Sequence, residues 1–285
     1  GYDFEMTKKN DNVILLLSGG LDTTTIWDML MKKFNLNVYP IFIRRGQIRM
    51  TVEEEAVDFF SRYYQKKFPK LFHLPKKLTT FIPPLEICWD ITKFGSIIVN
   101  DKLECRGIPM YGSFLANYAV QYGYYLEITQ GIKARTIFCG YVKDDGIHMR
   151  YETLTSLRTN TENIINITGD NSWQFTSLPI EKKLGYHFGK ETIAEYADFY
   201  KIPIENSFSC IKYSYYHCGR CFYCARRKDL FKKLKIKDKT IYLDKKSLIF
   251  NIFSRVKLIF SVFKFMNSII FDLYANFIYF LKSRW

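Results

Sequence analysis

The stretch Val13-Ile14-Leu15-Leu16-Leu17, followed by Ser18-Gly19-Gly20-Leu21-Asp22-Thr23-Thr24-Thr25, decides the fold. Five consecutive apolar residues predict a buried strand, and residues 23–34 predict a helix. The two glycines between them permit a tight turn and a close approach of the backbone. Backbone N–H groups and the positive end of the helix dipole then point at one spot, which is typical of a phosphate site. The alternative is an ordinary structural turn.

Side chains of this loop add to the predicted phosphate site. The hydroxyl groups of Ser18, Thr23 and Thr24 supply further hydrogen-bond donors. Asp22 is unusual in this position, because a carboxylate repels phosphate. We therefore expect Asp22 to act through a metal ion or a backbone N–H group.

The elements predicted downstream alternate between strands and helices. Strands are predicted at residues 37–43, 70–74, 78–82, 135–140 and 175–179, and helices at residues 51–68, 111–126, 151–165 and 190–200. This alternation predicts a Rossmann-like α/β fold, with a mostly parallel sheet and helices on both faces. Ligands bind such sheets beyond the carboxyl ends of the strands, where the Ser18 loop lies.

Length and composition set the wider limits. The 285 residues, 48% of them hydrophobic, suit an N-terminal extension at 1–11, one α/β domain at 12–244 and a tail at 247–285. The net charge of +14 favours anionic partners such as nucleotides, nucleic acid or lipid, with a lysine-rich bias as the alternative. The polar residues 1–11 do not resemble a signal peptide. Seven cysteines without a disulfide framework favour a reducing compartment, so we expect a cytoplasmic protein.

Four cysteines within fifteen residues predict a metal centre: Cys210, Cys218, Cys221 and Cys224. Four thiolates suit tetrahedral zinc, and a closed site of this kind is structural because no coordination position stays open. A redox pair and an iron–sulfur cluster are the alternatives. We expect His217 to be a bystander and the neighbouring arginines to offset the charge of the thiolates: Arg220, Arg226 and Arg227.

Together, the loop and the cysteines resemble the QueC family of 7-cyano-7-deazaguanine synthases, which are PP-loop ATP pyrophosphatases. Gly46-Gln47 resembles the family's Tyr-Gly-Gln, although Arg45 replaces the tyrosine. The stretch 189–193, Gly-Lys-Glu-Thr-Ile, resembles Ser-Lys-x-Glu-Ile. Residues 207–210, Ser-Phe-Ser-Cys, resemble Thr-Trp-Ser-Cys, and residues 217–227 match almost residue for residue. The resemblance covers about residues 12–234.

The resemblance implies adenylation of the carboxylate of 7-carboxy-7-deazaguanine by ATP, followed by attack of ammonia to give an amide and then, with a second ATP, a nitrile. It implies that Lys190 reaches the phosphates or the acyl adenylate and that Gln47 lines the nucleotide. Gly140 and Asp144 or Asp145, at another strand end, are candidates to contact base or metal. The residues implied to hold ATP with Mg²⁺ are Ser18, Gly19, Gly20, Asp22, Thr23 and Thr24.

Two segments depart from the family pattern. The family's Pro-x-Arg-Asn, which approaches the nucleotide, stands here as Pro109-Met110-Tyr111-Gly112. Arg106, just upstream, is a candidate for the missing cation. The family's Asp-Cys-Arg segment is not recognisable at residues 148–152. These departures and the basic charge resemble divergent members in bacterial antiphage defence, where the activated deazaguanine is directed to a macromolecule.

Residues 247–285 repeat apolar side chains at helical spacing. Charged residues at 255, 257, 264 and 272 interrupt them, so no uncharged stretch reaches the roughly 20 residues that span a membrane. Three interpretations stay open for this tail: it packs on its own domain or on a second copy, docks a partner protein, or lies on a membrane surface.

Three functions compete. The first is a synthase that makes a deazaguanine amide or nitrile. The second is a conjugating enzyme, in which an amine of a protein or nucleic acid captures the same adenylate. The third is an inactive ATP-binding interaction module, which the intact loop and Lys190 argue against. PP-loop tRNA thiolation, a further enzyme class, requires a reactive cysteine, and none is clearly poised here.

Overall fold

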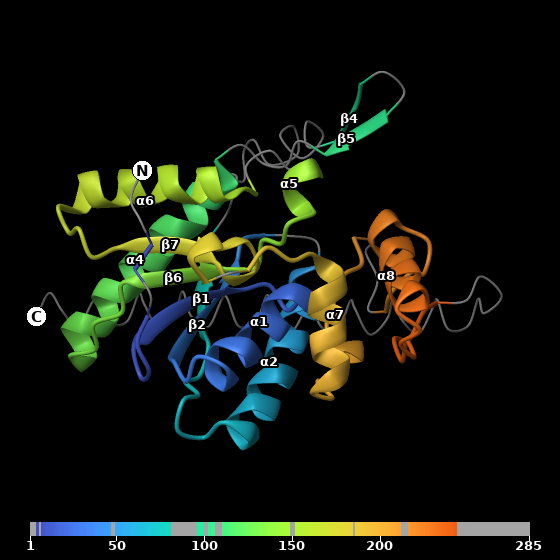
Figure 1. Ribbon diagram of the computed structural model, residues 1–285, viewed down its shortest axis with the longest axis horizontal. Coiled ribbons are helices and arrows are strands. Elements are labelled where there is room, and N and C mark those ends of the chain that lie inside the picture. The colour runs from blue at the N-terminus through green and yellow to red at the C-terminus, as the bar shows by residue number, and fades with distance from the viewer. Residues whose placement is uncertain are drawn as a thin grey trace, which may run out of the picture.

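A five-stranded sheet forms the centre of the computed structural model, which describes residues 4–5, 7–46, 49–80, 96–99, 102–105, 110–148, 152–184, 186–211 and 216–243. The strand order is β3-β2-β1-β6-β7, and every neighbouring pair is parallel (Figure 1). This arrangement confirms the predicted mostly parallel sheet. The strands are β1 (Asn12–Leu17), β2 (Asn37–Arg44), β3 (Lys76–Thr79), β6 (Thr136–Cys139) and β7 (Gln174–Ser177).

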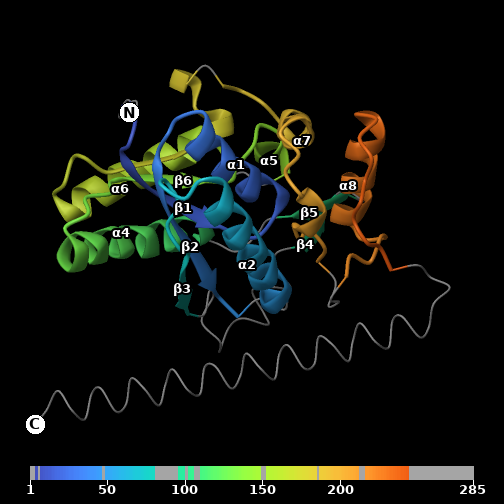
Figure 2. The ribbon, with the colours of Figure 1, turned by 90° about the horizontal axis from the view of Figure 1, so that it is seen from below.

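Strand β1 is buried on both faces of the sheet, which explains its unbroken apolar run. Val13, Leu15 and Leu17 enter one hydrophobic core, and Ile14 and Leu16 enter the other. The first core lies under α1 (Leu21–Lys32), α2 (Met50–Lys67) and α7 (Lys190–Phe199). The second lies under α4 (Tyr111–Gln130) and α6 (Leu154–Thr168), on the opposite face (Figure 2).

The order of the strands places a switch point between β1 and β6. The chain runs outward from β1 through β2 to β3, and then returns to β1's other side as β6 and continues to β7. Connections leave the two central strands on opposite faces, an arrangement that in open α/β sheets forms a crevice beyond the carboxyl ends of the strands. Ligands of open α/β sheets bind in such a crevice.

Several predicted elements differ from the structure. Residues 70–74 form no strand; Phe72 makes a single bridge to Val38. The strand predicted at 175–179 ends at Ser177, because Pro179 has no N–H group and residues 178–180 form a 3-10 turn. The charged helix α8 (Phe222–Lys233), which contains Cys224, was not predicted.

Further elements complete the described part of the chain. Strands β4 (Ser96–Val99) and β5 (Lys102–Cys105) form an antiparallel hairpin in a segment whose sequence gave no clear prediction. The short helix α5 (Asp145–His148) follows β6. Across the described ranges, no helix has both the length and the apolar character needed to cross a bilayer. The predicted tail, 247–285, lies outside the described residues.

A fully buried carboxylate, that of Asp28, joins three helices on one face of the sheet. Its Oδ2 accepts a hydrogen bond from Tyr196 Oη at 2.9 Å, and its Oδ1 pairs with Lys67 Nζ at 2.6 Å. Asp28 lies on α1, Tyr196 on α7 and Lys67 on α2. A buried carboxylate is tolerated only when it is paired in this way, so the contacts fix how the helices lie together.

We expect Tyr196→Phe to lower the free energy of unfolding by about 1–2 kcal/mol, because one oxygen of buried Asp28 loses its donor. Urea denaturation monitored by circular dichroism measures the change. Tyr200→Phe is the control. Lys32 Nζ lies 3.6 Å from the centroid of the Tyr200 ring, a contact that phenylalanine keeps, so this variant should lose less than about 0.5 kcal/mol of unfolding free energy. Equal losses in the two variants would contradict this role of the Tyr196 hydroxyl.

Candidate functional site

The loop between β1 and α1 lines the crevice at the switch point. Gly19 has φ +72, and a Cβ atom there would lie 2.5 Å from the carbonyl oxygen of Glu53, so only glycine fits. Gly140, which follows β6, lies against the first turn of α1; a Cβ atom at this position would overlap the Thr23 side chain. The structure therefore brings the ends of both central strands to the N-terminus of α1, where backbone N–H groups favour an anion.

The three hydroxyl groups predicted to face a phosphate do not lie alike. Ser18 Oγ and Thr23 Oγ1 are 3.1 Å apart beside the loop. The Thr24 hydroxyl instead donates to the carbonyl of Gly20 at 2.7 Å, and the residue is fully buried. Thr24 thus closes the first turn of α1 from inside, because its position in the helix turns the side chain toward the core.

Lys190, the first residue of α7, reaches across the crevice. Its Nζ lies 2.8 Å from Asp22 Oδ2 and 3.1 Å from Asp145 Oδ1. Burial by itself lowers the pKa of this ammonium group, but the two carboxylates outweigh burial and raise the pKa, so Lys190 carries a full charge. Three segments far apart in sequence therefore meet at one cation.

Asp144 and Asp145, which the sequence left as alternatives, have different positions. Asp144 Oδ2 accepts a hydrogen bond from the backbone N–H of Lys190 at 3.3 Å and so caps α7. Asp145 points to Lys190 Nζ, and its second oxygen accepts from Val142 N at 3.1 Å. Of the pair, only Asp145 joins the charged cluster.

Glu152 is a member of this cluster that sequence analysis missed. Burial first, and then the charge of Asp145, raise the pKa of its carboxyl group to about 8; Lys190 opposes the rise. Burial likewise raises the pKa of Asp145. Glu152 is the last residue of a segment that matches no family motif, and its proximity to Asp145 depends on how α5 and α6 fold, so the sequence held no signal for it.

The donor set fits a hard divalent cation. Asp22, Asp145 and Glu152 bring three carboxyl groups to one ammonium group. Oδ1 of Asp22 is buried, yet none of the described residues gives it a hydrogen bond. Carboxylate oxygens are the ligands that Mg²⁺ accepts alongside substrate phosphates. A cation bound at Oδ1 of Asp22 would neutralise the excess negative charge of these carboxyl groups.

A second wall of the crevice contains the two positions that depart from the family pattern. The guanidinium carbon of Arg45 lies 5.2 Å from the centroid of the Tyr111 ring. Glu53, a buried carboxylate, pairs with Arg49 and lies 3.9 Å from Arg45 Nη1. The family motifs have tyrosine at the position of Arg45 and arginine at the position of Tyr111, so the two residue types are exchanged in this chain. A cation and an aromatic ring nevertheless remain in contact. Arg106, the predicted substitute cation, lies outside the described residues, as does Gln47.

The four cysteines meet as predicted. All four sulfur atoms lie within 4.8 Å of one another and are buried, and none forms a disulfide. Sγ of Cys221 lies 3.9 Å from Sγ of Cys210, and Sγ of Cys218 lies 4.0 Å from Sγ of Cys224. Tetrahedral zinc with bonds of about 2.3 Å requires separations of about 3.8 Å, so the sulfur atoms fit this metal.

His217 is a bystander, as predicted. Its Nε2 accepts a hydrogen bond from the backbone N–H of Ser209 at 3.1 Å, so this nitrogen is already engaged. Burial, with help from Arg227, lowers the pKa of His217 to about 3, which keeps the ring neutral.

Of the three arginines near the cysteines, Arg227 is buried, and neutral oxygens surround its guanidinium group. It donates to Ser207 Oγ, Ser209 Oγ, Thr240 Oγ1 and the carbonyl of Ile204. Such a buried cation offsets the negative charge that a metal with four thiolates would carry.

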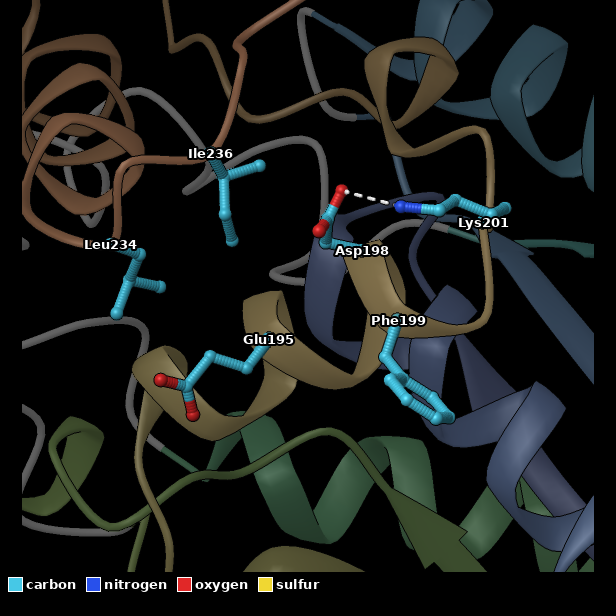
Figure 3. Close-up of a pocket in the computed structure, with 6 residues that line it drawn as sticks. All are labelled: Glu195, Asp198, Phe199, Lys201, Leu234 and Ile236. Atoms are coloured by element: carbon cyan, nitrogen blue, oxygen red, sulfur yellow. Dashed lines mark hydrogen bonds and ion pairs between the residues drawn. The ribbon is translucent and has the colours of Figure 1, made fainter.

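A cavity of about 510 Å³ lies elsewhere, at the far end of α7 (Figure 3). Its lining includes Phe199 and Leu234, together with an ion pair at 3.5 Å between Asp198 Oδ1 and Lys201 Nζ. The ten-residue helix α7, from Lys190 to Phe199, separates it from the charged cluster by about 13 Å along the helix axis. It shares no residue with the crevice.

Glu152→Gln should change how stability depends on pH. The folded protein holds a proton on Glu152 up to about pH 8, whereas an unfolded chain releases it near 4.5. The folded state thus binds more protons in this window, and the free energy of unfolding falls as pH rises through it. Without nucleotide and divalent cations, we expect the fall between pH 5 and pH 9 to be smaller in the variant by roughly 1–3 kcal/mol.

Urea denaturation at a series of pH values measures this difference. Glu195→Gln, an exposed position on α7, serves as the control and should follow the parent protein. Identical pH profiles for Glu152→Gln and the parent would show that the Glu152 carboxyl group titrates normally in the folded protein.

Comparison with known proteins places these features in a wider group. No protein-family model matches the chain. A 7-cyano-7-deazaguanine synthase of Methanococcus maripaludis (strain C6) is 26% identical over 249 residues, which cover 81% of this chain and 98% of that protein. One from Sulfurimonas denitrificans is 24% identical over 251 residues, covering 84% of this chain and 100% of the relative.

Among solved structures, the U34-tRNA thiolase NcsA from Methanococcus maripaludis with its [4Fe-4S] cluster is 14% identical, with a TM-score of 0.36. The match covers 80% of this chain and 68% of that one, and it is too weak to bear on activity. The similarity to curated synthases, in contrast, extends over about four fifths of this chain and nearly the whole length of each relative. Over about four fifths of its length, the chain is therefore a homologue of the 7-cyano-7-deazaguanine synthases, and the resemblance seen in its motifs is confirmed.

Proposed function

We propose that the chain is an ATP-dependent, AMP-forming carbon–nitrogen ligase that activates the carboxylate of 7-carboxy-7-deazaguanine for attack by an amine. The observation that carries the proposal is the meeting of the glycine loop, Asp22 and Lys190 at the switch point, with Nζ of Lys190 2.8 Å from Asp22. The similarity to curated synthases supports the substrate.

The loop would bind the triphosphate of ATP. Backbone N–H groups at Gly19 and Gly20 and the N-terminus of α1 supply donors, and Ser18 and Thr23 supply hydroxyl groups. Asp22 and Asp145 would hold Mg²⁺, which neutralises phosphate charge when bound. Lys190, which lies beside both carboxylates, would contact the α-phosphate or the acyl adenylate, where its positive charge stabilises the negative charge that develops.

The reaction proceeds in two displacements. An oxygen of the substrate carboxylate attacks the α-phosphorus of ATP, and pyrophosphate leaves. The nitrogen of an amine then attacks the carbonyl carbon, and AMP leaves as the carbon–nitrogen bond forms. The amine must lose a proton in this step. Near neutral pH Glu152, with a pKa of about 8, already holds a proton, so water accepts the proton of the amine.

The cysteine centre would hold Zn²⁺ in a structural role. Four protein ligands fill a tetrahedral site, which leaves no coordination position for substrate. The buried guanidinium group of Arg227 supports a site with net negative charge.

A second candidate function follows from the altered second wall. Arg45 and Tyr111 stand where the family has tyrosine and arginine, and the net charge is +14. Both observations favour transfer of the activated deazaguanine to an amine of a protein or nucleic acid, as in antiviral defence. The cytoplasmic location stays a prediction, as does a homodimer or a partner protein held through residues 247–285.

Incubation with ATP, Mg²⁺ and 7-carboxy-7-deazaguanine, with and without ammonia, tests both functions by mass spectrometry. AMP with a free amide or nitrile supports the synthase. AMP with a mass increase on a protein or oligonucleotide supports the conjugating enzyme. Nucleotide binding without AMP would contradict both and leave an inactive binding module.

Asp22→Ala should reduce AMP formation by at least about a hundredfold, because the cation and Lys190 lose their shared partner. Metal content, measured by inductively coupled plasma mass spectrometry, should stay at the parent value, since Asp22 is not a cysteine-centre ligand. Asp198→Asn, at the far end of α7, is the matched control and should retain full activity. Undiminished AMP release by Asp22→Ala would refute the assignment.

Exchanging the second-wall residues tests whether Arg45 and Tyr111 act as a pair. Arg45→Tyr leaves two aromatic rings and Tyr111→Arg leaves two cations, so each single change should lower kcat/KM by about tenfold or more, and the double exchange should recover most of the loss. Losses that simply multiply in the double variant would show that the two side chains act independently.

A further inference from the structure

The segment that leads into the cysteine centre also touches the nucleotide loop. We name residues Ser207–Cys210 the clamp segment. The backbone N–H of Phe208 donates to the carbonyl oxygen of Gly19 at 2.9 Å. The Phe208 ring is buried in a cluster with Val52 and Ala56 of α2 and the four cysteines. Phe208 thus contacts the nucleotide loop through its backbone and packs beside the four cysteines through its ring.

This hydrogen bond sets the direction of one peptide group. The carbonyl and N–H of a trans peptide point in opposite directions. With the Gly19 carbonyl held by Phe208, the N–H of Gly20 faces away from the clamp segment, on the side of the Ser18 hydroxyl, 3.3 Å away. Because glycines stand on both sides of this peptide group, it has little resistance to a flip, so its orientation depends on an external partner.

The clamp segment is in turn held by the cysteine centre and its surroundings. Cys210 is one of the four ligands, and its Sγ also accepts from Cys218 N at 3.4 Å. Ser209 N donates to His217, and Arg227 Nη1 donates to Ser207 Oγ at 3.0 Å and to Ser209 Oγ at 3.1 Å.

A second set of contacts connects Cys210 to the nucleotide loop, through residues at the start of α2. Arg49 Nη1 donates to the carbonyl of Cys210 at 3.4 Å, and the same guanidinium group pairs with the Glu53 carboxylate. The backbone carbonyl of Glu53 lies against Gly19. The glycine of the nucleotide loop is thus held from two sides, by Phe208 and by Glu53, and both sides connect to Cys210.

We infer that the four-cysteine centre is a positioning element for the nucleotide loop: the bound metal fixes Cys210, Cys210 fixes the Phe208 N–H, and that group orients the Gly19–Gly20 peptide toward the phosphates. Nucleotide affinity therefore depends on metal occupancy, although no cysteine contacts the nucleotide. The inference rests on the proposed ATP site, but it concerns binding and loop geometry rather than turnover.

Two measurements test the coupling without activity. Calorimetry with α,β-methylene-ATP and Mg²⁺ gives the nucleotide Kd, and hydrogen exchange gives the protection of the Gly20 and Phe208 amides. After chelation or in Cys224→Ser, we expect the Kd to rise about tenfold and both amides to exchange faster, while the core of the sheet stays protected. Adding Zn²⁺ back to the chelated protein should reverse both changes. Cys139→Ala, a buried cysteine outside the centre, is the control and should keep its metal and its affinity.

A matched pair of variants isolates the hydrogen bond. Phe208→Ala keeps the backbone N–H and removes the ring, whereas Phe208→Pro removes both. Ser207, at φ −77 and ψ 147, already has a backbone conformation compatible with a following proline. With metal bound in both variants, Phe208→Pro should bind the nucleotide analogue about tenfold more weakly than Phe208→Ala.

The outcomes separate this inference from the proposed function. Metal-dependent affinity and exchange in a protein that forms no AMP would sustain the positioning role and end the ligase proposal. AMP formation with equal affinity in metal-free and metal-bound protein, or unchanged exchange at Gly20 after chelation, would overturn the positioning role alone. Should the parent protein not bind the analogue, exchange at Gly20 decides the matter.

Discussion

The buried carboxylate of Asp28 fixes the geometry on which the site depends. It joins α1 to α7 through Tyr196 and to α2 through Lys67. Six residues earlier on the same two helices, Asp22 meets Lys190. The two contacts are six residues apart on α1 and also six residues apart on α7. The two helices therefore run side by side in the same direction. The buried carboxylate of Asp28 therefore holds α7 in the position from which Lys190 reaches the crevice.

The crevice itself combines excess negative side-chain charge with a backbone suited to anions. Asp22 and Asp145 pair with Lys190, and burial holds a proton on the nearby Glu152 up to about pH 8. Beside them, the glycine loop and the N-terminus of α1 present N–H groups. The carboxyl groups attract a cation and the N–H groups attract an anion. A ligand with both charges, such as a nucleotide phosphate with a divalent cation, would suit both.

The cysteine centre and the nucleotide loop form one continuous structure. Phe208, Arg49 and Glu53 connect Cys210 to Gly19 within a shared hydrophobic cluster. In the proposed site, a metal bound by the four cysteines would do more than stabilise its own loop, since Cys210 connects to the backbone of the glycine loop. This accounts for the presence of both motifs in one chain, although about 190 residues separate them.

The alternating elements, the glycine loop and the cluster of four cysteines could be predicted from local spacing in the chain: apolar runs indicate strands, glycines a tight turn, and Cys-x-x-Cys a candidate metal site. The sequence also selected Lys190, through a motif. Four features emerge only when the chain folds: Asp145 rather than Asp144 faces Lys190, Thr24 turns inward, Arg45 lies over Tyr111, and Glu152 joins the site. Each of these depends on packing between segments distant in the chain, and the burial and charge that shift a pKa exist only once those segments have come together.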